Sequence, residues 1–269
     1  MIRRERDGVV FYQFERLAQY STVLHAIFTR IGGTSQGSFH SLNVGHTVGD
    51  EPAAVEANLA TIFAVLGLSR QQIVTAHQVH GSHVAIVGSP ERNRLVPLTD
   101  GLITQEAGTA LLLRFADCLP LLLYDPLHQV IALAHVGWRG CVAGVVSNAL
   151  AALQSVFQCR PRDLIAGLGP AIGPCCYEVG PDLVAAIERV FGPGHGLLLD
   201  RTNGRTHFDL PAAVQRQLLT AGVEQIENSG LCTHCRTNEF FSHRAEKGHT
   251  GRFAAVLALP EAAPTPRDR

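Results

Sequence analysis

Two side chains that can bind a soft metal ion, Cys118 and His135, stand 17 positions apart, each next to an apolar segment. Cys118 follows the segment Leu111–Phe115 and a short turn, and His135 ends the segment Val130–His135. We interpret both segments as buried strands, because short continuous apolar runs are typical of strands covered on both faces. The two side chains can then reach one point at the rim of a sheet. Thiolate and imidazole are ligands for zinc or copper.

A third ligand of the same kind is available in His80. The strand-like segment Ile73–Gly81 carries two histidines, His77 and His80, at a spacing of three. In a strand an odd spacing places side chains on opposite faces, so at most one of them can join a given site. Gly81 indicates a turn and puts His80 at the end of its strand. For either histidine alone, a surface or hydrogen-bonded role is the simpler interpretation, and the case for His80 depends on Cys118 and His135.

Two segments could hold an anion close to such a metal. Arg30 stands beside a loop rich in Gly, Ser and Thr at residues 31–39, where exposed backbone N–H groups can face a negative charge. A plain turn is the better interpretation of this loop taken alone, because loops rich in glycine are common, and Asn43 adds a polar side chain to it. Arg139 stands at the start of the helix expected at residues 140–157, and a helix N-terminus attracts anions.

Four further cysteines form two short motifs. Cys175 and Cys176 are adjacent, and Cys232 and Cys235 form a C-x-x-C motif. The adjacent pair could be redox-active or nucleophilic, but two buried small residues would look the same. A single C-x-x-C without a second pair is a weak indication of zinc.

Composition limits the class of protein. With 46% hydrophobic and 17% charged residues, the chain of 269 residues can bury a sizeable core and is not of the disordered class. Because 22 Lys and Arg nearly balance 23 Asp and Glu, bulk charge gives no reason to expect a nucleic acid or a membrane surface as partner. We find no secretory signal and no apolar run of about 20 residues. We therefore expect a reduced, cytoplasmic protein whose seven cysteines are free, buried or metal-bound.

The expected elements alternate between strands and helices and show no internal repeat or linker. Helices are predicted from Asp50-Glu51-Pro52 to Gly67, where a proline and a glycine mark the two ends, and at Gly140–Phe157, Asp182–Phe191 and Pro211–Ala221. Further strands are predicted at Val9–Phe14 (an edge strand), Val23–Thr29, Val84–Val87, Asp100–Thr104, Leu164–Leu168 and Phe253–Leu259. We expect one domain over residues 1–259 and a disordered tail at residues 260–269, which is rich in proline and charge.

An ordered series of motifs over roughly residues 23–259 resembles the YfiH family. Members of this family are also described as laccase-domain proteins, multicopper polyphenol oxidases, purine nucleoside phosphorylases or peptidoglycan editing factors. The motifs are Thr29-Arg30-x-Gly32-Gly33, Ser41-Leu42-Asn43, Val48-Gly49-Asp50, Gln78-Val79-His80-Gly81, Ala116-Asp117-Cys118-Leu119-Pro120, Ala134-His135-Val136-Gly137-Trp138-Arg139-Gly140, Gly169-Pro170-Ala171-Ile172-Gly173, Cys176-Tyr177-Glu178-Val179, Cys232-Thr233, Phe241-Ser242 and Thr250-Gly251-Arg252. Together they are specific in a way that no single motif is.

The resemblance implies a single-domain α/β sandwich of the mixed α+β kind, with mixed sheets flanked by helices. It also implies one metal ion bound by His80, Cys118 and His135, which agrees with the interpretation from the residues alone. Three protein ligands leave a position for water or substrate, as in catalytic zinc sites, and copper is the alternative metal. This chain departs from the family pattern at Val136, where alanine is usual, and at His243, where tyrosine is common.

The activity implied is that of a zinc-dependent purine nucleoside phosphorylase. Such an enzyme converts adenosine or inosine and phosphate to the base and ribose 1-phosphate, and adenosine deaminase and methylthioadenosine phosphorylase activities are further expectations. Arg30 and Arg139 are the candidates for binding phosphate, and Asn43 and Asp117 for contacting the base or ribose. We expect small-molecule substrates only, and a monomer.

Three other functions compete with this one. A cysteine hydrolase or amidase acting on peptidoglycan precursors would use Cys118 as nucleophile and His135 as base. A copper-dependent polyphenol oxidase of the laccase type needs several His-x-His pairs, and the chain contains none. A binding protein without activity is the weakest alternative, because polar residues gather at the ends of apolar strands.

Overall fold

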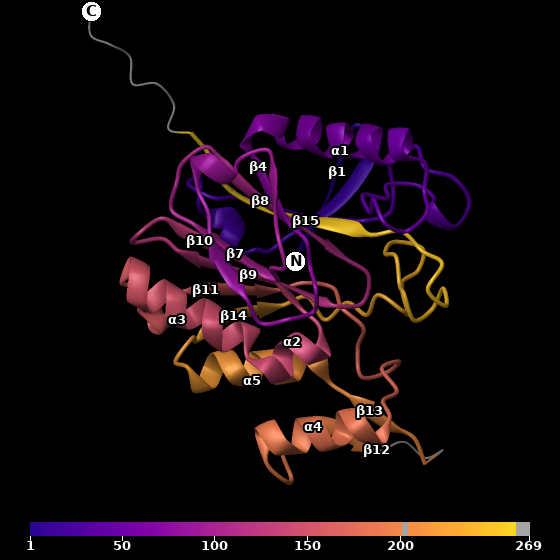
Figure 1. Cartoon of the computed structure of the whole chain (residues 1–269), viewed down its shortest axis with the longest axis vertical. Helices are drawn as coiled ribbons and strands as arrows, with labels where there is room; N and C mark the ends of the chain where they lie inside the picture. The colour runs from indigo at the N-terminus through magenta and orange to yellow at the C-terminus, as the bar shows by residue number, and fades with distance from the viewer. Residues whose placement is uncertain (201–203, 262–269) are drawn as a thin grey trace, which may run out of the picture.

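Two β-sheets pack face to face and helices cover their outer faces (Figure 1). The computed structural model describes residues 1–200 and 204–261. The first sheet contains, in spatial order, β1 (Ile2–Arg6), β2 (Val9–Gln13), β3 (Leu24–Phe28), β15 (Phe253–Leu259), β8 (Thr109–Phe115), β4 (Ile73–Ala76) and β6 (Arg94–Val96). The strand β4 runs parallel to β8 and β6, and the other neighbours are antiparallel.

The second sheet carries most of the candidate site. Its spatial order is β14 (Gln225–Asn228), β11 (Ile165–Leu168), β9 (Leu119–Asp125), β10 (Val130–Val136), β7 (Gly101–Thr104) and β5 (Val84–Ile86). The β11–β14 and β5–β7 pairs are parallel, and the pairs in the centre of the sheet are antiparallel. The structure therefore confirms the expected fold class, which is mixed sheets flanked by helices.

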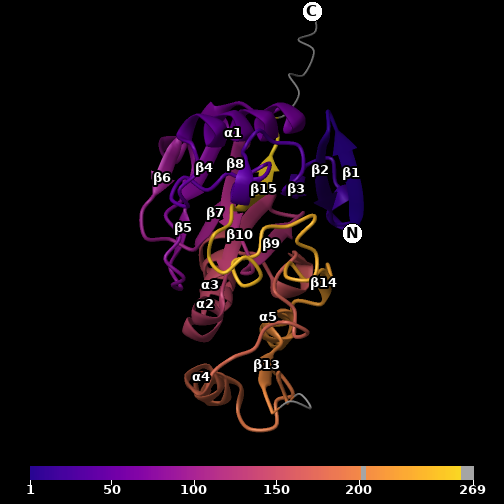
Figure 2. The same cartoon turned by 90° about the vertical axis from the view of Figure 1, so that its right-hand side faces the viewer.

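Helices cover the two outer faces unequally. The helix α1 (Pro52–Leu66) lies on the first sheet, and α2 (Trp138–Ala143), α3 (Val145–Phe157) and α5 (Leu210–Thr220) lie on the second. A small unit made of α4 (Pro181–Phe191), β12 (Leu198–Asp200) and β13 (Thr206–Phe208) projects beyond α5 (Figure 2). No helix among residues 1–200 and 204–261 has the length and apolar character needed to cross a membrane.

Successive side chains of each strand point to opposite faces of its sheet, so the continuous apolar runs contribute to three apolar layers. One layer lies between the two sheets, one lies under α1, and one lies under the helices on the second sheet. In β8, Leu111 and Leu113 point between the sheets, whereas Leu112 points to α1. In β9, Leu122 points between the sheets and Leu121 toward the helices on the far side. The central strands of both sheets are therefore buried on both faces, which explains why they lack the alternation of polar and apolar residues seen in a half-exposed strand.

The structure corrects three expectations about elements. Residues 119–125 form a strand, β9, that we had not predicted between the two apolar segments. The helix expected at residues 140–157 is two helices, because Gly144 adopts a left-handed conformation with φ 91° between α2 and α3. The predicted edge strand at residues 9–14 has a further strand, β1, on its outer side. The expected tail lies mostly outside the described residues, and the single-domain boundary at residue 259 stays a prediction.

Candidate metal centre

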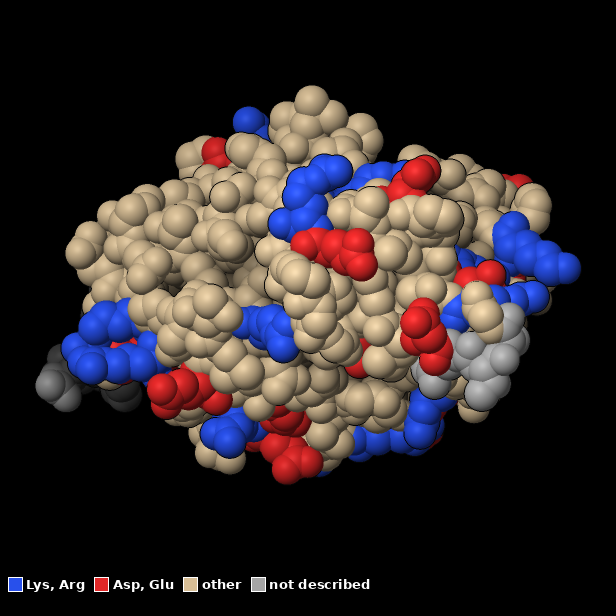
Figure 3. All heavy atoms as spheres, turned by 90° about the horizontal axis from the view of Figure 1, so that it is seen from below, with Lys and Arg blue, Asp and Glu red and all other residues tan. Residues whose placement is uncertain are grey.

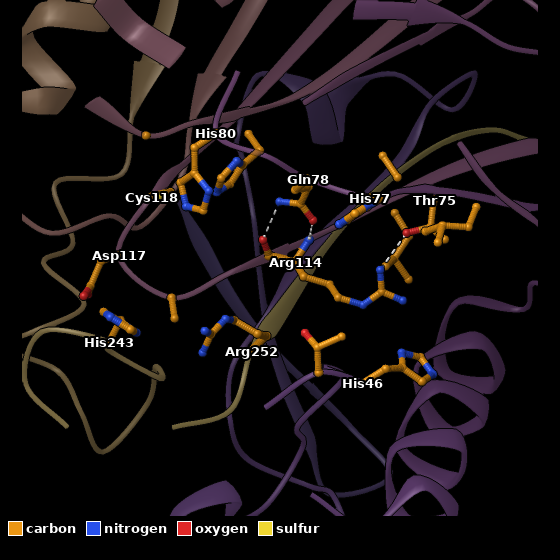
Figure 4. A pocket seen from close by; sticks show the side chains of 18 of the residues that line it. His46, Thr75, His77, Gln78, His80, Arg114, Asp117, Cys118, His243 and Arg252 are labelled. Carbon is orange, nitrogen blue, oxygen red and sulfur yellow. Dashed lines mark hydrogen bonds between the residues drawn. The ribbon is translucent and has the colours of Figure 1, made fainter. Parts of the chain in front are cut away.

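The three predicted ligands converge at one edge of the second sheet. The ligand atoms of His80, Cys118 and His135 all lie within 4.8 Å of one another. His80 belongs to the loop after β4, Cys118 directly precedes β9, and His135 lies in β10. The antiparallel register places Pro120 opposite His135, so the two strands bring Cys118 to the same end of the sheet. Figure 4 shows His80 and Cys118 side by side in the pocket.

One buried carboxylate, that of Asp100, orients two of these ligands. Its Oδ1 lies 2.9 Å from Nδ1 of His135, which leaves Nε2 of that ring to face Cys118 and His80. The same carboxylate accepts hydrogen bonds from the backbone N–H groups of Val79, His80 and Gly81 at 3.1, 3.0 and 2.7 Å. Burial raises the pKa of Asp100, but these hydrogen bonds outweigh burial and lower it. Asp100 is therefore an anion that fixes both the ring of His135 and the loop of His80.

The donor set has the electrostatics of a soft-metal site. Burial raises the pKa of Cys118, but the charge and hydrogen bonds of His135 and His80 lower it to about 6. For His135, burial lowers the pKa, whereas the Cys118 thiolate and Asp100 raise it to about 9. The thiolate form of Cys118 is thus favoured near neutral pH, and a thiolate with two imidazoles suits zinc or monovalent copper.

Gly137 leaves room beside the ligands. A Cβ atom at this position would lie 3.0 Å from Sγ of Cys118 and 3.3 Å from Cδ2 of His80. Both distances are shorter than ordinary carbon contacts, so any other residue would push the ligands apart. The three donors and the space that glycine keeps around them therefore fit one tetrahedral metal ion with one open position.

A cavity of about 860 Å³ opens from the ligands and matches the size of a small-molecule site. Its wall near the ligands combines aromatic and cationic side chains: Trp138, Arg139, Tyr177, His243, Arg244 and Arg252. The guanidinium of Arg139 stacks on Trp138 at 4.6 Å, and that of Arg244 lies 5.4 Å from the ring of Tyr177. Figure 4 shows His243 and Arg252 around the same cavity as the two labelled ligands.

Three of these cations form no ion pair among residues 1–200 and 204–261. No salt bridge there involves Arg139, Arg244 or Arg252. Arg252 donates to the backbone carbonyls of Thr250 and Gly251, and burial lowers its pKa. The cavity therefore presents guanidinium groups that form no ion pair in the described part of the chain, and the negative charges of Cys118 and Asp117 act on Arg252 without a direct contact. By contrast, acidic and basic side chains are interspersed on the molecular face shown in Figure 3.

Two residues expected to contact substrate lie outside the cavity wall. Arg30 donates to the backbone oxygens of His40 and Thr237, forms an ion pair with Glu246 at 3.0 Å and stacks on Phe241. Asn43 is fully buried, and its Oδ1 accepts hydrogen bonds from the backbone of Gly45 and Arg252. Neither lines the cavity. Both hold loops together, and only Arg139 and Asp117 of the four predicted substrate residues face the cavity.

Asp117 shapes the turn that presents Cys118. It adopts φ 89°, an unusual conformation for a residue other than glycine. Its Oδ1 accepts hydrogen bonds from the hydroxyls of Thr233 and Ser242 at 2.6 and 2.7 Å, and its Oδ2 accepts one from the backbone N–H of Arg244. Three bonds to the segment between β14 and β15, which is distant in sequence, thus stabilise the strained turn before the thiolate.

Reasoning from the sequence alone missed Asp100, Arg244 and Arg252. Asp100 is predicted only as the first residue of the strand Asp100–Thr104, and its bonds to residues 79–81 join segments that no local pattern connects. The two arginines stand in or near motifs of the family resemblance, Phe241-Ser242 and Thr250-Gly251-Arg252, so that signal was present without a role attached to it.

Comparison with known proteins gives a consistent set of relatives. The family model described as multi-copper polyphenol oxidoreductase laccase matches residues 24–260. The chain is 36% identical to purine nucleoside phosphorylase YlmD of Geobacillus stearothermophilus, over 90% of this chain and 92% of that protein. It is 38% identical to purine nucleoside phosphorylase SCO2081 of Streptomyces coelicolor, over 87% and 95% of the two chains.

Solved structures share the whole fold. The crystal structure of YlmD from Geobacillus stearothermophilus superposes with a TM-score of 0.90 at 34% identity and covers 96% of this chain and 98% of its own. A Bacillus licheniformis protein named YfiH superposes with a TM-score of 0.89 at 31% identity, with the same coverage. The face-to-face sheets and the helices around the candidate site are thus a shared architecture.

Proposed function

Because this chain belongs to the multi-copper polyphenol oxidoreductase laccase family, whose members include YfiH, we propose that it is a purine nucleoside phosphorylase. It would split adenosine or inosine with phosphate into the free base and ribose 1-phosphate, with methylthioadenosine as a further substrate. Relatives named purine nucleoside phosphorylase, 32–38% identical over most of the chain, support this reaction.

The observation that carries the proposal is the group of arginines beside the candidate ligands. Phosphorolysis needs an inorganic phosphate held next to the glycosidic bond, and guanidinium groups without carboxylate partners bind phosphate through paired N–H donors. Arg139, Arg244 and Arg252 meet this need because all three line the cavity without an ion pair among residues 1–200 and 204–261. They would orient a phosphate oxygen toward C1′ of the ribose and lower the repulsion between the anion and the departing base.

We assign His80, Cys118 and His135 as ligands of one zinc ion. When bound, zinc would supply a Lewis acid and a water of lowered pKa, which also suits deamination of adenosine. The chain's part is to hold the ring of His135 through Asp100 and the thiolate of Cys118 through the turn at Asp117. Asp117 is the carboxylate nearest to these ligands in sequence and lines the cavity, where we place it against the substrate.

Zinc is a better match than a laccase-type copper centre. In the part of the chain that the structure describes, the clusters of potential ligands contain at most two histidines, whereas a trinuclear copper centre requires many. A single site with two histidines and one cysteine does not supply the ligands that four copper ions need. The family name therefore gives little support to polyphenol oxidation by this chain, although one copper ion could occupy the same three ligands.

A cysteine hydrolase is the second candidate, and the lowered pKa of Cys118 is the observation in its favour. A thiolate with an adjacent imidazole is the minimal arrangement for a nucleophilic cysteine. The same thiolate cannot be a free nucleophile while it binds zinc, so the two functions exclude each other at this site.

The deciding experiment measures metal content and products together. Purified protein is incubated with inosine or adenosine, with and without phosphate, and products are separated by chromatography. We expect zinc, and release of free base only when phosphate is present. Cys118→Ala should lose this activity. Phosphate-independent turnover by zinc-free protein, abolished by alkylation of Cys118, would replace our proposal with the hydrolase.

The arginine assignment has its own test. Arg139→Ala should raise the KM for phosphate at least tenfold, equivalent to a loss of about 1.4 kcal/mol of binding, with a smaller effect on the KM for nucleoside. Arg30→Ala is the matched control, because its guanidinium contacts loops outside the cavity. An increase in the phosphate KM for Arg30→Ala but not for Arg139→Ala would overturn the assignment.

A further inference from the structure

Four cysteines from two distant segments meet in a second cluster. The Sγ atoms of Cys175, Cys176, Cys232 and Cys235 all lie within 4.8 Å of one another. The first two belong to the loop after β11, and the other two to the segment between β14 and β15. The fold thus supplies the C-x-x-C motif with the second pair that it lacks in sequence. We propose that these four thiolates bind a second zinc ion, which has a structural role.

The distances between sulfur atoms suit a shared metal ion. Sγ of Cys235 lies 3.5 Å from that of Cys175 and 3.4 Å from that of Cys176. Four sulfur atoms bound to zinc at about 2.3 Å in a tetrahedron are separated by roughly 3.8 Å. A disulfide would require about 2.05 Å, and all four cysteines are free thiols in the structure. The two distances from Cys235 are slightly shorter than this separation and no pair exceeds 4.8 Å, so small shifts of the four side chains would place the sulfur atoms around a common centre.

Gly173 contacts two of the four cysteines. The backbone N–H of Gly173 donates to Sγ of Cys232 at 3.2 Å. Gly173 also fits closely, because a Cβ there would lie 3.3 Å from Cβ of Cys232 and 3.4 Å from Sγ of Cys175. Hydrogen bonds of this kind around a ligand sulfur orient it and stabilise its charge.

Four protein ligands leave no open position, so the ion would act as a cross-link. It would connect two segments that also pair directly, since Ala171 forms a β-bridge with Cys232 and the N–H of Thr233 donates to the carbonyl of Ala171. Both segments reach the candidate metal centre. The N–H of Ile172 donates to the carbonyl of Asp117, and the hydroxyl of Thr233 donates to the Asp117 carboxylate. The second zinc ion would thus stabilise the wall behind the turn that presents Cys118.

Metal stoichiometry in selective variants tests the proposal without reference to activity. The protein is reconstituted with zinc under reducing conditions, freed of excess metal by gel filtration and subjected to elemental analysis. Wild-type protein should hold about two zinc ions, Cys118→Ala about one, and the double variant Cys232→Ser, Cys235→Ser about one. Cys141→Ser is the matched control, because Cys141 is a buried thiol outside both clusters, and it should retain about two. A Cys118→Ala protein without metal would overturn the proposal.

Two further measurements keep the test decisive if the double variant does not fold. In cobalt-substituted Cys118→Ala, an intense thiolate-to-cobalt charge-transfer band should be present, since four thiolates would surround the ion. In wild-type protein, the exposed thiols of Cys175 and Cys235 should react slowly with an alkylating reagent until a chelator is added. Rapid alkylation without chelator, disulfides among these cysteines detected by mass spectrometry, or iron in place of zinc would each contradict the assignment.

Discussion

Asp100 is the residue on which the geometry of the candidate metal centre depends most. It connects His135, near the end of β10, with the loop of His80, which follows β4 and is distant in sequence. Both carboxylate oxygens are used, and the side chain is fully buried. Residues that orient metal ligands in this way contribute to metal affinity although they do not touch the metal.

Asp100→Asn should lower zinc affinity by about 10- to 100-fold. The amide nitrogen that replaces one oxygen would face N–H donors of the His80 loop, so at least one hydrogen bond to the ligands or their loop is lost. Competition with a chromophoric chelator measures the affinity. Asp209→Asn is the control, since Asp209 accepts a backbone hydrogen bond from Ala212 at the start of α5, outside the metal centre. Equal affinities of Asp100→Asn and wild-type protein would refute this role.

Single residues could be predicted as ligands where their chemistry and their place in a strand coincided. His80, Cys118 and His135 each stand next to an apolar run, and the structure brings them together. Arg30 and Asn43 had the right chemistry for substrate binding, but their side chains form hydrogen bonds with backbone groups of loops that meet only in the folded chain. The same limit applies to the four-cysteine cluster, whose two halves are more than fifty residues apart in sequence.

At the scale of elements, the start of α2 is the feature most closely tied to the site. Gly137 precedes this helix with φ −85° and ψ 173°, a conformation open to any residue, so the need for glycine comes from space alone. Gly180 precedes α4 with almost the same backbone angles, φ −88° and ψ 173°, and a Cβ there would meet nothing within 4 Å.

Gly137→Ala should therefore reduce zinc affinity at least tenfold, whereas Gly180→Ala should leave it unchanged. Both substitutions carry the same cost at a helix N-cap, a few tenths of a kcal/mol up to about 1 kcal/mol. The difference in zinc affinity between the two variants isolates the contact of the new methyl group with Cys118 and His80. A loss of the same size in both variants would show that the helix start, and not the ligand space, was disturbed.

Elements were predictable where the signal was local. The first helix has its proline and glycine at the expected ends, and the last strand has the expected bounds. The strand β9 escaped prediction because Pro120, its second residue, reads as a break in the apolar run. The interruption at Gly144 was also missed, since the apolar spacing continues across it.

At the scale of the whole molecule, His25 links stability to pH. Its ring is buried in the first sheet, and its Nε2 accepts a hydrogen bond from the backbone N–H of Phe14 at 2.8 Å. Burial lowers the pKa of His25 from 6.5 to about 4, and the charge of Glu227 only partly opposes this. Protonation would remove the acceptor and leave a buried cation.

The free energy of unfolding should therefore fall as the pH drops from about 6.5 to about 4. In this range the unfolded chain binds a proton at His25 that the folded chain does not, so stability rises with pH. The full contribution is on the order of 3 kcal/mol. His25→Gln keeps an acceptor without a titratable ring and should show a flatter curve in urea titrations between these pH values. Identical curves for the variant and wild-type protein would disprove the assignment.

The position of β15 determines when folding can finish during synthesis. This strand is formed by residues 253–259, yet it lies in the middle of the first sheet, between β3 and β8. Until those residues leave the ribosome, β3 and β8 each expose an unpaired strand edge beside the apolar layer between the two sheets. A nascent chain that stalls before residue 253 is thus left with two unpaired strand edges, and edges of this kind are sites at which incomplete chains aggregate.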